Sequence, residues 1–582
     1  MGKNRETQKR KDLGAFYTPS NLAKLTSSNA VESFLVENIN SLTNSKFSSV
    51  HEILNEGDKS IILKVNSLIR TISVLDVSTG DGQFLISILG KIKELRSVIS
   101  KKFGEKEFKP HTVELEILNS NIFGIEIDSI AVSECYMNMI KNLAKSNISL
   151  VQKILKNNIL QGNFLESKPQ DWHNFSFKKQ GFDIIIGNPP WGGKLTRDQK
   201  NYYHKLFSLE CPKRNLNTFS LFVYHATELL NPYKGILAFL LPKNVARSNQ
   251  YTFLRGYIVK HYKILKLSFY GLFKDVTQEF ISLMAQRTDI SPKDHLMLID
   301  EKIRIPQSSY LTNLDFIFTK TYDTHSQELI NIIRKNSLSL SRFLTIRRGE
   351  ELSKRGGIMY CPYCLKWVQL SSRKAKITCP QCLRILNDHE LLIQNIIQKE
   401  ADLNHNQPIL TGDDFDQFSI ISNHYIDPSI DYRSKKNKQI YRPPKIVVQK
   451  IKRYPCAAFE SRGYWTTQNV YNLSLTPEYR EKKELLYYIL AVLNSSLYRW
   501  YYEIQFNLES NYTNAISIHN LKRLLIKKPS FSDPIFIQII DKTKKILEKK
   551  SQIDSEDINE INELILRYYD CENMAQFLIA SD

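Results

Sequence analysis

The sequence lacks the segments that mark membrane-spanning and secreted proteins. Its 582 residues contain no long uncharged apolar run, and the best candidate, residues 236–242, is far too short to span a bilayer. The N-terminus begins Met1-Gly2-Lys3-Asn4-Arg5, which is polar and charged and has no signal-peptide apolar stretch. We therefore expect an intracellular protein in which thiols stay reduced.

Internal repeats and long low-complexity tracts are also missing, and acidic residues are too few to balance the basic ones. Lys and Arg total 80 against 60 Asp and Glu, for a net charge of +20. Such an excess favours a polyanionic partner, nucleic acid first, although a diffuse basic surface is the alternative. A hydrophobic fraction of 42% excludes global disorder, and the length fits two or three domains.

The first 290 residues alternate strand-like apolar runs with helical patterns, which predicts an α/β domain with a mostly parallel sheet of seven strands. The expected strands cover residues 73–77, 122–127, 159–160 onward, 182–186 and 235–241, with a hairpin at 265–270 and 279–285. Helices are expected at residues 83–99, 130–144 and 219–230.

The pattern then changes. Residues 291–343 read as a connector with one helix at about 325–334. Residues 344–530 are richer in β signals, charges and aromatics and have no βαβ rhythm, which predicts an α+β domain. Residues 531–582 read as a helical segment with paired lysines.

Residues 187–191 read Gly-Asn-Pro-Pro-Trp and directly follow the apolar run at 182–186. The Asn188 amide and the Pro189 carbonyl can accept hydrogen bonds from an exocyclic NH2 group, while the Trp191 indole can cover a ring face. Proline fixes the backbone, so such carbonyls can be held toward a substrate. Asn-Pro-Pro is also an ordinary turn signal, which is the alternative.

Two polar turns follow the first two expected strands. Residues 74–85 carry Asp76, Gly80 and Gly82, where a carboxylate can hold a cationic amine and the glycines let the backbone approach a ligand. Residues 122–128 end in carboxylates that can accept both ribose hydroxyls. The Gly-x-Gly-x-x-Gly dinucleotide fingerprint is incomplete. S-adenosylmethionine, a nucleoside with an amino-acid tail, therefore fits best; ordinary strand-end turns are the alternative.

Four motifs together, at residues 14–19, 76–85, 124–128 and 187–191, carry a family resemblance. They occur in the order seen in γ-class N6-adenine DNA methyltransferases, and the chain resembles the TaqI type over residues 14–290. The resemblance implies a Rossmann-like S-adenosylmethionine-dependent catalytic domain over residues 1–290. A DNA target-recognition domain over 344–530 and C-terminal helices would follow it.

The resemblance also implies roles for individual residues. Tyr17, Thr18 and Pro19 would close over the methionine end of the cofactor, and Asn188 and Pro189 would bind the target N6 amine. Trp191 would stack on the flipped base, with Phe222 as a second aromatic contact, unless Phe222 belongs to the core face of its helix. The implied cofactor-binding residues are Tyr17, Thr18, Pro19, Asp76, Ser78, Gly80, Gly82, Glu126, Asp128, Asn163 and Phe164, and the implied catalytic residues are Asn188, Pro189, Pro190 and Trp191. Asn163 stands where the family usually has aspartate.

The implied activity is site-specific methylation of adenine in double-stranded DNA by a cytoplasmic, nucleoid-associated enzyme with no membrane partner. It would be the modification part of a restriction-modification or related defence system, with a separate restriction endonuclease or other subunits as partners. Only about 13 residues precede the first motif, and no nuclease pattern is convincing elsewhere, which favours a stand-alone methyltransferase. RNA base and protein glutamine methyltransferases, which share Asn-Pro-Pro-aromatic, are the alternatives.

Four of the eight cysteines form two Cys-x2-Cys knuckles, Cys361/Cys364 and Cys379/Cys382, separated by 14 residues. Four thiolates at this spacing predict a structural zinc ribbon over residues 358–385, with an iron centre or a metal-free remnant as the alternatives. Its basic and aromatic neighbours suit nucleic acid, and a purely structural clip is the alternative; these neighbours are Lys366, Trp367, Arg373, Lys374 and Lys376.

The recognition half resembles the TaqI-like specificity domain less sharply, at residues 347–352, 410–415, 441–446, 464–467 and 491–495. Its positive charge is concentrated with tyrosines between residues 432 and 454, which predicts a surface that grips the DNA backbone, with a solvated basic face as the alternative for about half of it. The cations are Arg433, Lys435, Lys436, Lys438, Arg442, Lys450, Lys452 and Arg453, and the tyrosines are Tyr432, Tyr441 and Tyr454.

Overall fold

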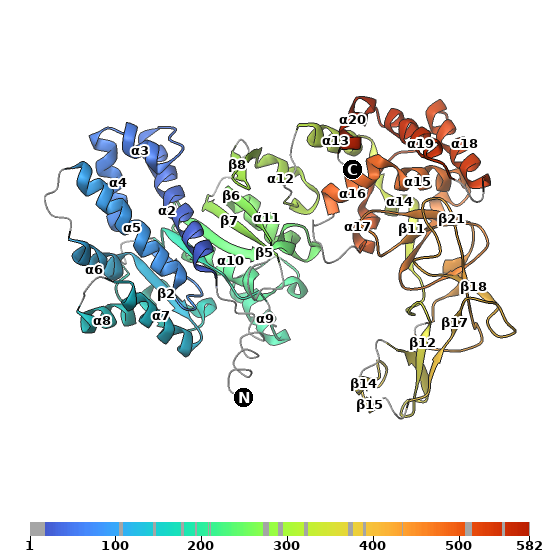
Figure 1. Ribbon diagram of the computed structural model, residues 1–582, viewed down its shortest axis with the longest axis horizontal. Helices are drawn as coiled ribbons and strands as arrows, with labels where there is room; N and C mark the ends of the chain where they lie inside the picture. Colours follow the sequence, from blue (N-terminus) through green and yellow to red (C-terminus); the bar gives the residue numbers. More distant parts are fainter. Residues whose placement is uncertain are drawn as a thin grey trace. The chain divides into compact units, whose positions relative to one another are not determined.

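A computed structural model describes residues 18–103, 109–143, 147–175, 180–191, 195–207, 209, 211–271, 279–288, 295–318, 324–370, 376–387, 391–433, 435–506, 515–549 and 553–580. The chain divides into two compact units, Met1–Lys320 and Thr321–Asp582. In Figure 1 the first unit runs from blue to green and the second from yellow to red. Each unit is described by itself below.

The first unit is built on a nine-stranded sheet with the strand order β3-β2-β1-β4-β5-β7-β6-β8-β9. Strands β3, β2, β1, β4 and β5 are parallel, and β7 runs antiparallel between β5 and β6. This arrangement confirms the predicted Rossmann-like α/β fold with a mostly parallel sheet, but the sheet has nine strands where the sequence predicted seven. The strands are β1 (Val74–Asp76), β2 (Ile122–Glu126), β3 (Ile159–Gln161), β4 (Ile184–Gly187), β5 (Ile236–Pro242), β6 (Tyr262–Tyr270), β7 (Phe280–Arg287), β8 (Leu296–Ile299) and β9 (Ile303–Pro306).

The sheet continues beyond residue 290, where the sequence indicated a connector. Strand β8 pairs in parallel with β6, and β9 returns antiparallel to β8, so residues 296–306 complete the sheet edge. In the sequence, the boundary between the two units falls between residues 320 and 321. The predicted connector, residues 291–343, is therefore divided between them.

Helices cover both faces of the sheet (Figure 1). One face packs against α2 (Ser20–Thr43), α4 (Lys59–Thr71), α5 (Gln83–Lys102) and α6 (Pro110–Ser120), in a core that includes Ile184 and Ile186. The intervening Ile185 points to the opposite face because strand side chains alternate. Helices α10 (Thr218–Leu229) and α11 (Thr252–His261) contact β5 and β6. The remaining helices are α3 (Val50–Glu56), α7 (Ser129–Lys141), α8 (Ile148–Asn158), α9 (Arg197–Leu206) and α12 (Ser308–Thr312).

The second unit is α+β, with several small sheets instead of one large one. Two of its sheets are four-stranded, with the strand orders β11-β23-β20-β21 and β17-β19-β18-β22. Smaller sheets are β13-β12-β16, β14-β15 and β10-β24. The strands are β10 (Ser337–Ser339), β11 (Leu344–Arg348), β12 (Gly357–Cys361), β13 (Lys366–Gln369), β14 (Lys376–Thr378), β15 (Ile385–Asn387), β16 (Ile393–Asn395), β17 (Ile397–Gln398), β18 (Gln407–Leu410), β19 (His424–Ile426), β20 (Lys445–Gln449), β21 (Ala457–Glu460), β22 (Trp465–Thr466), β23 (Val470–Leu475) and β24 (Leu525–Lys527).

The predicted C-terminal helices are present and share a core with the sheet. Residues of β11, β20 and β23 lie in one hydrophobic cluster with the helices, so residues 531–582 are not a separate segment. The helices of this unit are α13 (Thr324–Arg334), α14 (Leu340–Phe343), α15 (Glu484–Asn494), α16 (Ser496–Phe506), α17 (Ile518–Arg523), α18 (Pro534–Glu548), α19 (Ser555–Tyr568) and α20 (Ala575–Ala580). Among the described residues, no helix is both long and apolar enough to cross a membrane.

Candidate active site and nucleic-acid interface

The strand order reverses between β1 and β4. From β1 the sheet continues through β2 and β3 on one side, and from β4 through β5 on the other. Ligands of open parallel sheets bind outside the carboxyl ends of the strands at such a switch point. The turn after β1 and the Asn-Pro-Pro-Trp segment after β4 therefore lie at the expected place.

Asp76, the last residue of β1, is fully buried and incompletely paired. Its Oδ1 accepts a hydrogen bond from the Ser78 N–H at 3.1 Å, whereas Oδ2 and the Ser78 hydroxyl have no partner among the described residues. Burial, together with the nearby Glu126 and Asp81 carboxylates, raises the pKa of Asp76 to about 8. Such a buried acid favours a ligand that brings a positive charge or hydrogen-bond donors.

Glycines let other backbone segments approach this acid. Gly82 has a φ of 89°, and a Cβ there would lie 2.8 Å from the Cys135 Sγ. Residues 187–191, Gly-Asn-Pro-Pro-Trp, are called the hook below. A Cβ at Gly187, the first residue of the hook, would lie 3.3 Å from the Asp76 Oδ1 and 3.3 Å from the Ser78 hydroxyl. The start of the hook and the end of β1 are thus in direct contact.

The end of β2 is tied to the glycine turn by Glu126. One carboxylate oxygen accepts the Gly80 N–H at 3.0 Å, and the other accepts the N–H groups of Ile127 and Asp128. Asp128 caps α7 by accepting the Ile130 N–H at 3.0 Å. The sequence analysis missed Ile127, whose side chain is 60% exposed beside this acid; an apolar residue directly after a strand-end carboxylate was the signal.

Asn163 and Phe164 follow β3. The Asn163 amide donates to Glu166 at 2.9 Å and to the Tyr203 hydroxyl at 3.2 Å. Asn163 also lines a cavity of about 410 Å³ bounded by Ile125, Tyr136, Ile159 and neighbouring residues.

The Phe164 ring packs 4.9 Å from the Phe222 ring on α10, and both side chains are buried. In this structure Phe222 therefore contributes to the core face of its helix.

The hook itself contacts the N-terminal motif. The Asn188 amide donates to the Thr18 hydroxyl at 3.2 Å, which joins two motifs that lie 170 residues apart. Pro19 follows Thr18 and accepts the first hydrogen bond of α2, from the Ala23 N–H. Tyr17 lies outside the described residues.

Trp191 is half-buried, with Pro189 buried and Pro190 half-buried before it. Its indole N–H donates to the Leu240 carbonyl at the end of β5, at 3.3 Å. The indole ring lies 6.3 Å from the Phe280 ring on β7. The first residue of the hook thus contacts the end of β1, and its last residue is hydrogen-bonded to β5.

The four clustered cysteines come together in the second unit. Their sulfur atoms all lie within 4.8 Å of one another. Both knuckles make the same turn, in which Leu365 donates to the Cys361 carbonyl and Leu383 donates to the Cys379 carbonyl, each at 2.9 Å.

Burial acts to raise the pKa of Cys361, but the N–H groups of Cys364 and Tyr363 outweigh it and lower that pKa to about 7. The donor set and its chemistry fit a tetrahedral Zn²⁺. Arg373 and Lys374 lie outside the described residues.

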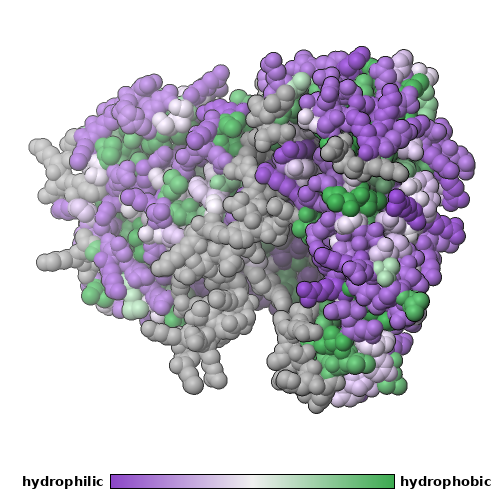
Figure 2. Space-filling model, turned by 45° about the vertical axis from the view of Figure 1, so that its right-hand side comes forward, coloured by the Kyte–Doolittle hydropathy of each residue, from purple (hydrophilic) through white to green (hydrophobic). Residues whose placement is uncertain are grey.

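The predicted basic surface is partly used inside the unit. Lys435 donates to the carbonyls of Pro428 and Ile430, and Lys436 pairs with Glu351 at 3.3 Å. Arg453 pairs with Glu503 at 2.9 Å. By contrast, Arg433, Lys438 and Arg442 are exposed. The visible face in Figure 2 is mostly hydrophilic, with small separate hydrophobic patches.

Two family models match the chain. The Eco57I restriction-modification methylase model matches residues 120–274, and the TaqI-like C-terminal specificity domain model matches residues 407–526. The chain contains a methylase domain and a specificity domain of these types. The resemblance inferred from the motifs is thereby confirmed for both halves.

The chain is similar to two curated restriction enzyme and methyltransferase proteins. It is 29% identical over 198 residues to a putative type II protein of Methanocaldococcus jannaschii, covering 31% of this chain and 16% of that one. It is 22% identical over 332 residues to RM.Eco57I of Escherichia coli, covering 51% of this chain and 32% of that one. The chain thus spans less than a third of the length of these relatives.

Among solved structures, the type IIL restriction-modification enzyme MmeI in complex with DNA has the same fold. The TM-score is 0.58 at 12% identity, over 96% of this chain and 76% of that one.

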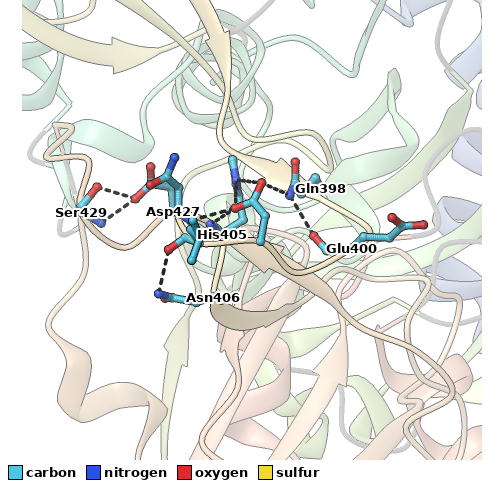
Figure 3. Close-up of polar contacts among 9 residues, drawn as sticks. Gln398, Glu400, His405, Asn406, Asp427 and Ser429 are labelled. Carbon is cyan, nitrogen blue, oxygen red and sulfur yellow. Dashed lines mark hydrogen bonds and ion pairs between the residues drawn. The ribbon is translucent and has the colours of Figure 1, made fainter.

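The second unit carries a loop that the sequence analysis also missed, which connects β17 to β18 just before the matched specificity domain (Figure 3). Asp402 accepts hydrogen bonds from Gln398, from the N–H groups of Asn404 and His405, and from the His405 ring at 3.0 Å. These bonds hold the pKa of Asp402 well below its usual range. The loop presents Leu403, which is 96% exposed.

Proposed function

We propose that this protein is a site-specific DNA methyltransferase that transfers a methyl group from S-adenosylmethionine to N6 of an adenine flipped out of duplex DNA. The observation that carries the proposal is the meeting of three motifs at one switch point. Gly187 contacts Asp76 and Ser78, and Asn188 donates to Thr18. The methylase and specificity domain matches support both the reaction class and the DNA substrate.

The residues around Asp76 fit S-adenosylmethionine. The buried Asp76 Oδ2 and Ser78 hydroxyl offer acceptors to its amino-acid portion, and Glu126 stands at the next strand end for its ribose. The exposed Ile127 side chain offers an apolar face to a flat ring. The bound cofactor would supply an electrophilic methyl group on a sulfonium.

The hook would make adenine N6, the nitrogen that receives the methyl group, a better nucleophile. Adenine N6 is a poor nucleophile because its lone pair is delocalised into the ring. The Asn188 amide oxygen and the Pro189 carbonyl would accept hydrogen bonds from the two N6 protons, which favours a more tetrahedral nitrogen. The N–C bond would form as the S–C bond of the sulfonium breaks, and one N6 proton would then be lost to water. The contribution is positioning and electrostatics, with no covalent enzyme intermediate. Trp191 would cover the face of the flipped base and offset part of the unstacking free energy.

Two further proposals concern the cysteine cluster of the second unit and the biological system in which the enzyme acts. The cysteine cluster would bind one structural Zn²⁺, since its four sulfurs meet at tetrahedral spacing. The enzyme would be the modification part of a restriction-modification system, a proposal supported by its similarity to restriction enzyme and methyltransferase proteins.

The substitution Asn188→Ala tests the proposal. It removes an N6 acceptor while leaving Asp76 and Glu126 in place, so methylation should fall about 100-fold or more with S-adenosylmethionine affinity retained. The control is Asn55→Ala, which removes an exposed amide on α3. Undiminished methylation by the Asn188 variant would remove the hook from the mechanism.

A further inference from the structure

A basic segment of the second unit, Tyr432–Arg442, is held in place by one buried carboxylate. Glu350, two residues after the end of β11, is fully buried. Its two oxygens accept hydrogen bonds from the Tyr432 hydroxyl at 2.6 Å and the Tyr441 hydroxyl at 2.9 Å. They also accept the Lys436 N–H at 3.2 Å. One side chain thus fixes the start, the middle and the end of the segment.

The end of the segment has further anchors. The buried Lys445 ammonium, which pairs with Glu460, donates to the Tyr441 carbonyl at 2.9 Å. The Tyr441 ring stacks on the Trp465 ring at 5.5 Å, and the Lys438 ammonium lies 5.8 Å from the centre of that same ring. The position of Lys438 therefore depends on the platform that Tyr441 completes.

The start of the segment is attached to the cysteine ribbon, β12–β15. The Arg433 N–H donates to the Trp367 carbonyl at 3.0 Å, and Trp367 forms a parallel bridge with Tyr432. The Arg433 guanidinium donates to the Pro380 carbonyl within the second knuckle, and Gln369 donates to the Arg433 carbonyl. The ribbon and Glu350 thus hold neighbouring residues of one segment.

The cations that this arrangement presents are Arg433, Lys438 and Arg442, all exposed. Arg442 has no ion pair with any described residue, whereas Lys435 and Lys436 are used internally and the exposed Arg433 guanidinium also donates to the Pro380 carbonyl. Three exposed cations on a segment fixed at several points suit the regularly spaced phosphates of a duplex. Both Glu350 and the ribbon precede residues 407–526, so they lie outside the matched specificity domain.

We propose that Glu350 is a positioning residue for DNA binding. By its hydrogen bonds it holds the basic segment next to the ribbon, so that Arg433, Lys438 and Arg442 can contact the DNA backbone at the same time. The inference rests on the proposed function, because it assumes a duplex DNA substrate. Beyond the proposed function, it names a residue that positions the DNA-contacting cations without itself contacting a phosphate.

The test compares Glu350→Gln with the double substitution Tyr432→Phe plus Tyr441→Phe. The first weakens the acceptor and the second removes two donors, and both nearly keep the side-chain volume. The control, Glu114→Gln, alters a buried carboxylate of the first unit, which pairs with Lys93 at 2.7 Å. The probe is a random-sequence DNA duplex, titrated at several salt concentrations.

We expect both variants to bind the duplex about tenfold more weakly, with a salt slope lower by about two, and the control to match the wild type. Hydrogen exchange of the Lys436 amide should quicken in Glu350→Gln. Unchanged affinity and salt slope in both variants would overturn the inference, and so would weaker binding without faster exchange. Failure of the wild-type protein to bind any duplex would instead defeat the proposed function, and the inference with it.

Discussion

The buried Asp76 makes the stability of the ligand-free protein depend on pH. Its pKa is raised from 3.8 to about 8 by burial and by two neighbouring carboxylates. An aspartate in the unfolded chain is ionised above about pH 4, whereas native Asp76 keeps its proton up to about pH 8. Because the native state binds the extra proton, this contribution to stability is full below about pH 4 and is lost as the pH rises toward 8.

The size of the effect follows from the shift. Each pH unit between the two pKa values changes the free energy of unfolding by about 1.4 kcal/mol, so raising the pH from about 6 to about 8 should cost about 2–3 kcal/mol. Asp76→Asn resembles the protonated acid in shape and neutrality. Its oxygen can still accept the Ser78 N–H, and this part of the pH dependence should disappear.

The assay is hydrogen exchange of β1 without cofactor, because the amides of Val74–Asp76 report on the first unit alone. Exchange rates are first corrected for the pH dependence of intrinsic exchange. Between about pH 6 and about pH 8 the free energy of opening of β1 should then fall more steeply in the wild type than in Asp76→Asn, by about 1.4 kcal/mol per pH unit, as expected for one proton. The variant should be the more stable protein near pH 8 and should have lost cofactor affinity. If the free energy of opening depended on pH in the same way in both proteins, Asp76 would not have a raised pKa in the ligand-free protein, and the account would be refuted.

Two further predictions concern the glycine turn and the cysteine cluster. Gly82→Ala should destabilise the first unit by about 1–3 kcal/mol, because φ is 89° and a Cβ would lie 2.8 Å from the Cys135 Sγ. Gly90→Ala on α5, with nothing within 4 Å of its Cβ, should be neutral or stabilising by up to about 1 kcal/mol, as judged by urea unfolding. The purified protein should contain one zinc per chain by elemental analysis, and Cys379→Ser should lose it while Cys211→Ser keeps it. Full zinc in Cys379→Ser, or equal stability of the two alanine variants, would contradict these expectations.

Much of the first unit could be predicted because its strands are short apolar runs followed by polar turns. Residues 182–186 illustrate the limit of this approach. The sequence indicated a strand from Phe182, but β4 begins at Ile184, since the Phe182 N–H donates to the Leu229 carbonyl at the end of α10. A helix far along the chain set that boundary. The extension of the sheet by β8 likewise depends on its pairing with β6, which no local pattern records.

The candidate site shows the same division. The sequence placed Asp76 and Asn188 at the ends of two predicted strands, but it contained no sign that Asn188 would donate to Thr18. The apparent cluster of cations was the least informative pattern. Lys435 and Lys436 look like Lys438 and Arg442 in the sequence, yet the first two are bound to carbonyl groups and to Glu351, whereas the other two are exposed. The three-dimensional contacts are needed to distinguish cations that are bonded within the protein from cations that are exposed to solvent.

The central claim is methyl transfer to adenine in duplex DNA, and it is tested most directly by incubating the protein with S-adenosylmethionine labelled on its methyl group. Unmethylated duplex DNA, total RNA and a protein extract would serve as parallel acceptors, and the DNA product would be sequenced for modified bases. The account predicts label in the DNA alone, as N6-methyladenine at one recurring sequence. Label in RNA or protein with none in DNA, or a methylated base other than adenine, would contradict it.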